Sequence, residues 1–248
     1  MLIRMVCRWN CTKYKMSIFR FKQFEIDQSG CAMKINTDGV LIGAIASNHQ
    51  PKRGLDIGTG TGVISMMLAQ RYPQLSVHAV EIDAQAAESA GKNFENSDFK
   101  SRLSVSHVAI EHFETADKFD LIVSNPPFFV NDLKNEEVRK GIARHADDDF
   151  FEILIRKANE LLAKQGRLWL ILPVKQASEV IALALTHQLK LVERINLHSD
   201  AQKPIFRQII CLAKEDLEFR ETDFNIYESF KVHSQAYKVL LKDFFLAF

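Results

Sequence analysis

The sequence lacks a long hydrophobic run: no stretch reaches the roughly 18 apolar residues that a membrane-spanning helix requires. Its first fifteen residues mix basic and apolar side chains, but they contain neither an unbroken apolar core nor a small-residue cleavage site. We therefore expect a cytoplasmic protein with no membrane partner.

Cysteines are few and scattered. There are four, and only Cys7 and Cys11 lie close together, with no second pair and no histidine cluster nearby to complete a zinc-ligand pattern. We therefore expect reduced thiols, as is usual in the cytoplasm, and no metal ion.

The chain also has little net charge, +1 over 248 residues, so the whole molecule is not an obvious binder of polyanions. Basic residues are nevertheless concentrated near its start, before the first acid at Glu25. They are Arg4, Arg8, Lys13, Lys15, Arg20 and Lys22. This segment is either a solvated tail or an arm that touches phosphates. Since Met16 is an alternative start, we expect residues 1–16 to be a basic, disordered extension.

An apolar content of 47% over 248 residues is sufficient for one large domain. From residue 54 onward, short β-branched runs alternate with stretches of helical periodicity, which favours a parallel sheet covered by helices on both faces. The last two strands have no helix between them and predict a hairpin, with one antiparallel strand at the end of the sheet. Strands are expected over 54–58, 75–82, 103–110, 119–124, 167–173, 189–199 and 207–215, and helices over 62–72, 83–97, 150–166 and 176–188.

The predicted fold class is therefore α/β, with a seven-stranded, mostly parallel sheet in one domain. Residues 51–215 form its core, residues 17–50 an N-terminal segment and residues 216–248 a C-terminal extension.

A glycine-rich turn, LDIGTGTG (55–62), joins the first of these strands to the following helix. Gly58, Gly60 and Gly62 allow a tight turn and a close approach of a ligand to the backbone. A loop that seats a dinucleotide pyrophosphate has the spacing G-x-G-x-x-G. Here the spacing is G-x-G-x-G, and Asp56 precedes it. A carboxylate at that place would repel a pyrophosphate and suits a ligand that carries an ammonium group.

A second acid completes the pattern. Glu81 ends the next strand, 21 residues after Gly60, where it is well placed to accept hydrogen bonds from both hydroxyls of a ribose. Asp56, the three glycines and Glu81 together predict a site for S-adenosylmethionine. The alternative is a tight turn with a solvated acid.

Three motifs resemble those of the class I methyltransferases: DIGTGTG (56–62) their first, VEID (80–83) their second and NPPF (125–128) their fourth. The resemblance implies a Rossmann-like class I methyltransferase fold with S-adenosylmethionine as cofactor and no metal. Within that class, Asn-Pro-Pro-aromatic implies methylation of a planar nitrogen, such as a nucleobase amine or a glutamine amide.

Two further stretches narrow the resemblance. FRFKQFEIDQSGCAMKINTDGVLIGAIA (19–46) and the tail YESFKVHSQAYKVLLKDFFLAF (227–248) are similar to segments of the bacterial tRNA1(Val) adenine-N6 methyltransferases. This resemblance implies that tRNA is the partner and that methyl is transferred to the N6 amine of the adenosine next to the anticodon.

The resemblance assigns catalysis to the NPPF motif. The side-chain oxygen of Asn125 and the carbonyl of Pro126 would hold the two hydrogens of the amine, and Pro126 and Pro127 fix the backbone in the required orientation. Phe128 would stack on the base, worth about 1–3 kcal/mol, once the base has left its own stack. The simpler alternative is a rigid turn after a strand.

The resemblance also assigns residues to the cofactor. Ile82 belongs to the second motif, and Ala109 stands where many relatives have an Asp that binds the adenine amine, so another group would have to accept that hydrogen bond. Thr37 and Asp38 belong to a segment that folds over the methionine end of the cofactor. They could also cap a helix that begins at Gly39.

Basic residues near the predicted site are candidates for contacts with RNA. The segment 131–149 is polar and long for a loop, and we expect it to be mobile and to face the substrate. The candidates are Arg139, Lys140, Arg144, Lys203 and Arg207. At each position the alternative is a solvated charge.

Other functions remain open from the sequence. The same chemistry could act on a guanine of ribosomal RNA, an adenine of DNA or a glutamine of a protein. A nicotinamide-dependent oxidoreductase on a similar sheet is disfavoured by the G-x-G-x-G spacing and by Asp56. A catalytically silent RNA-binding module would not need Asn125.

Overall fold

The computed structural model describes residues 18–29, 31, 34–127 and 139–248, with the backbone alone over 139–149. Within these residues the central sheet has eight strands in the order β10-β8-β9-β7-β6-β3-β4-β5. The strands are β3 (Arg53–Ile57), β4 (Ser76–Glu81), β5 (Leu103–His107), β6 (Phe119–Ser124), β7 (Leu162–Leu172), β8 (Lys190–His198), β9 (Ile205–Ala213) and β10 (Arg220–Asn225).

The sheet is parallel except at one strand. β9 pairs antiparallel with both β7 and β8, whereas all other neighbouring pairs, including β10 with β8, are parallel. The predicted α/β class and the β8–β9 hairpin are confirmed. The sheet has eight strands instead of the predicted seven. Its antiparallel strand, β9, lies between β8 and β7 and not at the end of the sheet, because β10 continues the sheet beyond β8. The strand β10 is a charged and largely exposed edge strand, RETDFN, which carries no apolar alternation that could reveal it.

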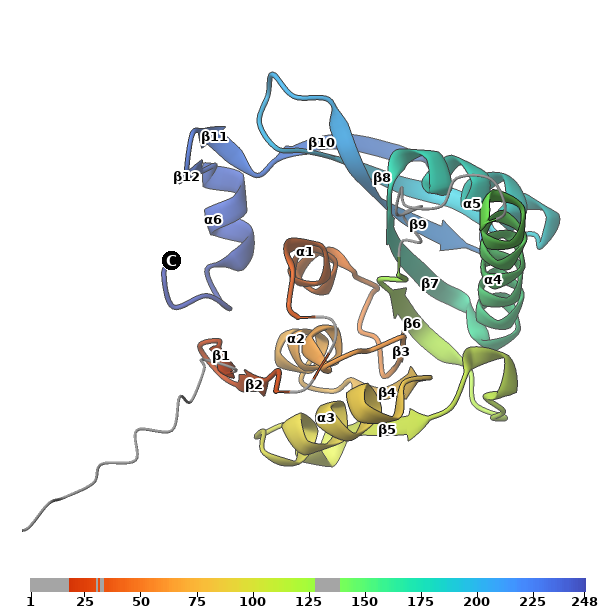
Figure 1. The fold of residues 1–248 in the computed structure, drawn as a ribbon, viewed down its shortest axis with the longest axis horizontal. Helices are drawn as coiled ribbons and strands as arrows, with labels where there is room; N and C mark the ends of the chain where they lie inside the picture. Colours follow the sequence, from red (N-terminus) through yellow and green to blue (C-terminus); the bar gives the residue numbers. More distant parts are fainter. Residues whose placement is uncertain (1–17, 30, 32–33, 128–138) are drawn as a thin grey trace, which may run out of the picture.

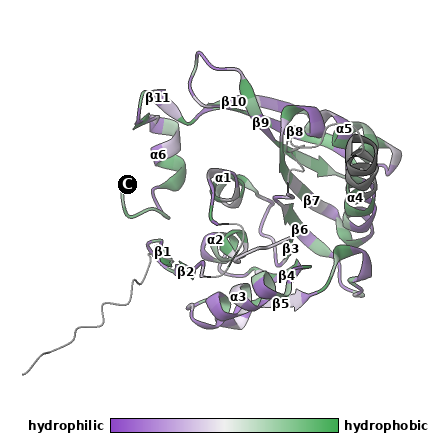
Figure 2. Ribbon diagram, in the orientation of Figure 1, coloured by the Kyte–Doolittle hydropathy of each residue, from purple (hydrophilic) through white to green (hydrophobic). Residues whose placement is uncertain are grey.

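Helices cover both faces of the sheet (Figure 1). α1 (Thr37–Ile45), α2 (Val63–Arg71) and α3 (Ala84–Glu95) contribute to one apolar cluster, and α4 (Arg139–Leu161) and α5 (Val174–Thr186) contribute to a second. Figure 2 shows the apolar strands between these two layers. Two short 3-10 helices, Lys100–Arg102 and Ile110–His112, flank β5. In the described part of the chain, no helix is both long and apolar enough to cross a membrane.

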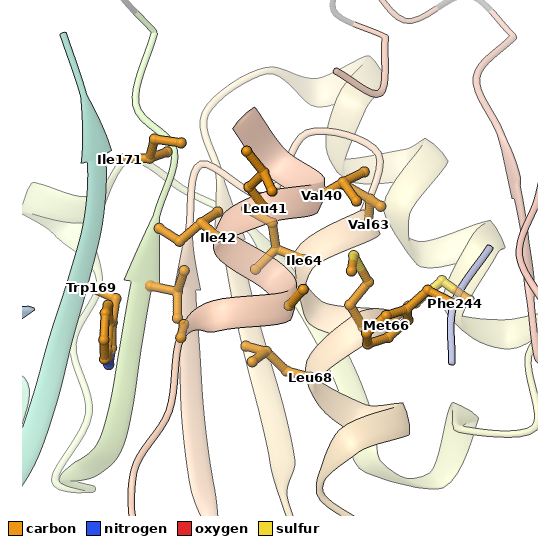
Figure 3. Packing of buried hydrophobic residues seen from close by; sticks show 14 of the residues in the cluster. Val40, Leu41, Ile42, Val63, Ile64, Met66, Leu68, Trp169, Ile171 and Phe244 are labelled. Atoms are coloured by element: carbon orange, nitrogen blue, oxygen red, sulfur yellow. The ribbon is translucent and has the colours of Figure 1, made fainter. Parts of the chain in front are cut away.

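α1 is packed between the sheet and α2 (Figure 3). Its residues from Asp38 to Ala44 are all buried. Gly43 permits this packing, because a Cβ there would lie 2.9 Å from the sulfur of Met67 on α2. On the other side, the indole of Trp169 donates a hydrogen bond to the carbonyl of Ser47, 2.8 Å away.

The two ends of the described chain meet beside this layer. The hairpin of β1 (Ile18–Arg20) and β2 (Glu25–Asp27) joins the C-terminal part through a bridge between Phe21 and Phe245. The C-terminal part consists of β11 (Tyr227–Ser229), β12 (Val232–His233) and α6 (Gln235–Leu241). Aromatic rings fill the junction; Phe21 stacks on Phe24 with ring centroids 4.4 Å apart.

The α4–β7 region differs from the prediction at both of its boundaries. α4 begins at Arg139, so the described part of the expected loop 131–149 is helical, and residues 131–138 lie outside the described residues. The helix ends at Leu161 rather than continuing to residue 166, because Leu162 already pairs with Phe119 of β6. An irregularity follows, and Gly166 fits because a Cβ there would lie 2.8 Å from the carbonyl oxygen of Phe119.

Candidate functional site

The predicted site residues gather at the carboxyl ends of three adjacent parallel strands. Ile57 at the end of β3 pairs with Val80 of β4 and with Ser124 of β6, so the loops that follow these strands begin side by side. The hydroxyl of Ser124 also donates a hydrogen bond of 2.8 Å to the carbonyl of Ile57. Ligands of open α/β sheets bind at this edge.

The glycine loop adopts the conformation that its sequence predicts. Gly58, Gly60 and Gly62 have φ values of +72°, +57° and +88°, a region that side chains disfavour. A Cβ on Gly58 or Gly60 would meet no atom of the described residues within 4 Å, so within this part of the chain the loop is open to a ligand on that side. A Cβ on Gly62 would lie 2.5 Å from the ring of Phe94, so the third glycine is also required by packing against α3.

Asp56 lies beneath the loop and is fully buried. Its Oδ2 accepts hydrogen bonds from the hydroxyls of Thr59 (2.6 Å) and Ser65 (2.7 Å) and from the backbone N–H of Ser65 (3.2 Å). Burial raises the pKa of Asp56 to about 6, although these hydrogen bonds act in the opposite direction. Its Oδ1 is buried and has no hydrogen-bond partner among the residues that the structure describes. The sequence did not predict that Asp56 also organises the loop.

Glu81 braces the loop from β4. Its Oε2 accepts a hydrogen bond from the backbone N–H of Gly60 at 2.8 Å, and its Oε1 accepts one from that of Asp83 at 3.0 Å. Each carboxylate oxygen has a further lone pair for a ligand hydroxyl. Ile82, the next residue, is 69% exposed and offers an apolar surface beside the two acids.

The strand beyond β4 brings Ala109 to the same edge. The backbone N–H of Val108 donates to the carbonyl of Glu81 at 2.9 Å, which holds the end of β5 beside β4. Ala109 is half-buried, and its carbonyl accepts a hydrogen bond from the backbone N–H of His112 at 3.0 Å.

The Asn-Pro-Pro motif begins directly after β6. Asn125 is half-buried, Pro126 is buried and Pro127 is exposed, whereas Phe128 lies outside the described residues. The amide of Asn125 faces the first turn of α1, since a Cβ on Gly39 would lie 3.6 Å from its Nδ2. The same Cβ would lie 3.7 Å from Val63, which opens the helix after the glycine loop. Asn125 and the helix that follows the glycine loop therefore meet at the start of α1.

α1 begins two residues before the predicted start at Gly39, and neither Thr37 nor Asp38 caps it. The cap is Asn36, whose side-chain oxygen accepts a hydrogen bond from the backbone N–H of Gly39 at 2.8 Å. Thr37 is exposed in the first turn, and Asp38 is buried there.

Among the candidate RNA contacts, Arg207 is ion-paired within the protein, whereas Lys203 is exposed. Arg207, at the start of β9, donates from its Nε to Oδ2 of the buried Asp38 at 3.0 Å, so it ties β9 to α1. Lys203 is exposed in the turn between β8 and β9. The remaining candidates lie on the first turns of α4, with their side chains outside the described residues: Arg139, Lys140 and Arg144.

These residues fit S-adenosylmethionine. The orphaned Oδ1 of Asp56 would be compensated by a cation, and the open side of the glycine loop leaves room for a ligand. Glu81 supplies acceptors for ribose hydroxyls, and the exposed Ile82 an apolar contact for a base. Among the described residues, no group of three or more His, Cys, Asp or Glu side chains could hold a metal ion.

Comparisons with known proteins agree with this arrangement. The family model of the methyltransferase small domain matches residues 36–199. A tRNA1(Val) (adenine(37)-N6)-methyltransferase of Pedobacter heparinus is 54% identical over 230 residues, which are 93% of this chain and 98% of that protein. One of Christiangramia forsetii is 40% identical, covering 92% and 97%. The crystal structure of a predicted O-methyltransferase from Agrobacterium tumefaciens shares the fold, with a TM-score of 0.66 at 20% identity over 84% of this chain and 96% of that one.

Proposed function

The chain belongs to the methyltransferase small domain family and to its branch of tRNA1(Val) (adenine(37)-N6)-methyltransferases, and from this premise we propose that it methylates N6 of adenosine 37 in tRNA1(Val). The methyl donor is S-adenosylmethionine. The observation that carries the proposal is the placement of Asn125 and the glycine loop on adjacent strands around the start of α1. We assign residues 1–248 to a single methyltransferase domain, in which residues 17–50 cover the cofactor.

In this proposal the loop residues hold the cofactor. The negative charge of Asp56 balances the positive charge of the ammonium group in the methionine part of the cofactor. Glu81 accepts hydrogen bonds from the ribose hydroxyls of the cofactor. Thr37 and Asp38 lie near the methionine end, and Ile82 and Ala109 line the adenine. When bound, S-adenosylmethionine supplies a methyl group that is already activated by a sulfonium.

The Asn-Pro-Pro motif then holds the nucleophile. The lone pair of an adenine amine is delocalised into the ring, so the amine must turn toward tetrahedral geometry before it can attack. Asn125 Oδ1 and the Pro126 carbonyl each accept a hydrogen bond from one N–H of the adenine amine, and these two hydrogen bonds favour the tetrahedral geometry. Pro126 and Pro127 keep the carbonyl oriented because proline fixes φ. Phe128 stacks on the extruded base.

Catalysis in this scheme is mainly alignment of nitrogen, methyl and sulfur. Positioning of this kind can supply roughly 7–11 kcal/mol. The N–CH3 bond would form as the S–CH3 bond breaks, with S-adenosylhomocysteine as the leaving group. The chain need not provide a strong base, because the amine proton becomes acidic once the new bond forms and would pass to solvent.

A panel of substrates tests the proposal. Labelled S-adenosylmethionine is offered with tRNA lacking the modification, ribosomal RNA, DNA and a protein extract. We expect label in tRNA alone, in N6-methyladenosine, and its loss after RNase treatment. Label in ribosomal RNA, DNA or protein would contradict the assigned substrate and would favour one of the other nitrogen acceptors.

Replacement of Asn125 tests the catalytic assignment. Asn125→Ala should lower kcat by about 100-fold or more, as removal of one catalytic hydrogen-bond partner typically does, and should change the Kd for S-adenosylmethionine by less than about threefold. The control is Asn96→Ala, which removes an exposed amide from the end of α3 and should leave both values unchanged. An active Asn125→Ala would exclude this role.

A further inference from the structure

Asn93 on α3 is a buried polar residue that the roles assigned so far leave unused. It is 3% exposed and lies outside the three motifs of the site. Its Oδ1 accepts a hydrogen bond from the backbone N–H of Asp27 at 2.9 Å, and its Nδ2 donates to the carbonyl of Asp27 at 3.1 Å. The same Nδ2 donates to the carbonyl of Thr61 at 2.9 Å. One amide therefore joins β2, α3 and the glycine loop.

The bond to Thr61 fixes a peptide plane of the loop. The Thr61 carbonyl belongs to the peptide between Thr61 and Gly62, and the N–H of that peptide donates to the carbonyl of Thr59 at 3.0 Å. Because a peptide is planar, two partners on opposite sides determine its orientation. The peptide before Gly60 is held in the same way by Glu81. Glu81 and Asn93 thus brace the loop from two sides.

The neighbouring residue reinforces this brace. Phe94 lies against Gly62, with its ring 2.5 Å from the place of a Cβ. Asn93 and Phe94 are both buried, so the end of α3 touches the loop through one polar and one apolar contact. Glycines with positive φ have wide conformational freedom, so a loop with three of them needs such contacts to keep one shape before the ligand arrives.

We propose that Asn93 is a positioning residue for the cofactor: acting through the Thr61 carbonyl, it keeps the glycine loop in its binding conformation and fastens the β1–β2 hairpin to the loop. This inference rests on the proposed function, since it assumes that the loop binds S-adenosylmethionine. Its consequence is that loss of the Asn93 amide weakens cofactor binding while the aligned amine still reacts at its normal rate.

The test compares Asn93→Asp with two matched controls. Asn93→Asp keeps a side-chain oxygen that can accept the hydrogen bond from the backbone N–H of Asp27. It replaces the amide nitrogen, so the hydrogen bonds to the carbonyls of Asp27 and Thr61 are lost. Ser89→Ala removes a 3.3 Å hydrogen bond from the Ser89 hydroxyl to the same Asp27 carbonyl without touching the loop. Asn96→Asp introduces the same chemical change at the exposed residue that directly follows the same helix. Asn93→Ala, which leaves room for water at both carbonyls, serves as a second variant if Asn93→Asp fails to fold.

The readouts are calorimetric titration with S-adenosylhomocysteine, KM and kcat for S-adenosylmethionine, and Tm. We expect the Asn93 variant to raise Kd and KM about tenfold, as loss of a buried hydrogen bond does, and to leave kcat within about twofold. Both controls should keep the wild-type Kd, KM and kcat. A lower kcat and Tm with unchanged KM would mean a structural role only and would overturn the inference. Failure of the wild type to bind S-adenosylhomocysteine would instead overturn the proposed function.

Discussion

Asp56 combines two tasks at the scale of one residue. It shapes the glycine loop through Oδ2, whereas its Oδ1 is buried with no hydrogen-bond partner in the described part of the chain. A buried carboxylate with an orphaned oxygen is unfavourable in the protein alone, and a cationic group of the cofactor would compensate it. We therefore expect Asp56→Asn to weaken binding of S-adenosylmethionine.

The raised pKa of Asp56 predicts a pH dependence of stability. Burial raises this pKa from 3.8 to about 6, so the folded protein binds a proton more tightly than the unfolded chain. The stability that this adds is fully present below about pH 4 and is lost as the pH rises through about 6. A shift of this size corresponds to roughly 3 kcal/mol.

Urea denaturation between pH 4 and pH 7 checks this expectation. Other groups also titrate in this range, so the informative quantity is the difference between the wild type and Asp56→Asn. The free energy of unfolding of the variant should fall less as the pH rises from about 4 to 6. Parallel pH profiles would show that folding does not raise the pKa of Asp56.

Single residues could be predicted from the sequence where a motif fixes both their type and their spacing. Asp56, the glycines, Glu81 and Asn125 lie together as the motifs predict. The role of Asn93 could not be foreseen, because its three hydrogen bonds go to backbone atoms of residues 27 and 61, far from it in sequence. The Asn36 cap was within reach, since Asn is a preferred capping residue and precedes Thr37.

At the scale of elements, the three glycines of the loop are not equivalent. Gly60 has a positive φ and no atom of the described residues within 4 Å of the place of a Cβ, whereas Gly62 also packs against Phe94. Gly60→Ala should lower the free energy of unfolding by about 1–2 kcal/mol through backbone strain. Gly62→Ala should lower it by about 3 kcal/mol, because overlap with a packed ring adds to the strain.

Chemical denaturation of the two variants measures this difference. Phe94→Leu removes the ring atoms nearest to Gly62, so the double variant Gly62→Ala with Phe94→Leu should be less destabilised than the sum of the two single changes. Additive effects would show that the contact with Phe94 does not limit the loop. Equal effects of Gly60→Ala and Gly62→Ala would lead to the same conclusion.

Elements with a clear apolar period were predictable, and those without one were not. The strand over 119–124 agrees with β6, and the helix and strand patterns from 54 to 97 agree with β3 through α3 within about two residues. The first turns of α4 are polar, and β10 is a charged edge strand, so neither carries a hydrophobic signal. The end of α4 was misplaced because the pairing of Leu162 with β6 overrides helix propensity.

At the scale of the whole molecule, two candidate RNA contacts differ in their surroundings, since Arg207 is paired with a carboxylate and Lys203 is exposed. Arg207 pairs with Asp38, which is buried on α1. Arg207→Gln should therefore leave that carboxylate without its ionic partner and lower the free energy of unfolding by about 1–2 kcal/mol.

Lys203 should show the opposite behaviour, because it is exposed in the β8–β9 turn. Lys203→Gln should leave the free energy of unfolding unchanged and raise the KM for tRNA. The slope of log K for tRNA binding against log salt concentration should become shallower by about one, because about one fewer counterion is released. Thermal denaturation and salt titrations of tRNA binding separate the two residues. A normal KM for Lys203→Gln would remove this lysine from the RNA-binding surface.

The most direct test of the proposed reaction uses two tRNA1(Val) transcripts that differ only at position 37. One carries adenosine and the other guanosine, which has no N6 amine. With labelled S-adenosylmethionine, we expect one methyl group per adenosine-37 transcript, recovered as N6-methyladenosine, and none on the guanosine-37 transcript. Equal labelling of both transcripts, or none on either while the cofactor still binds, would contradict adenosine 37 as the target.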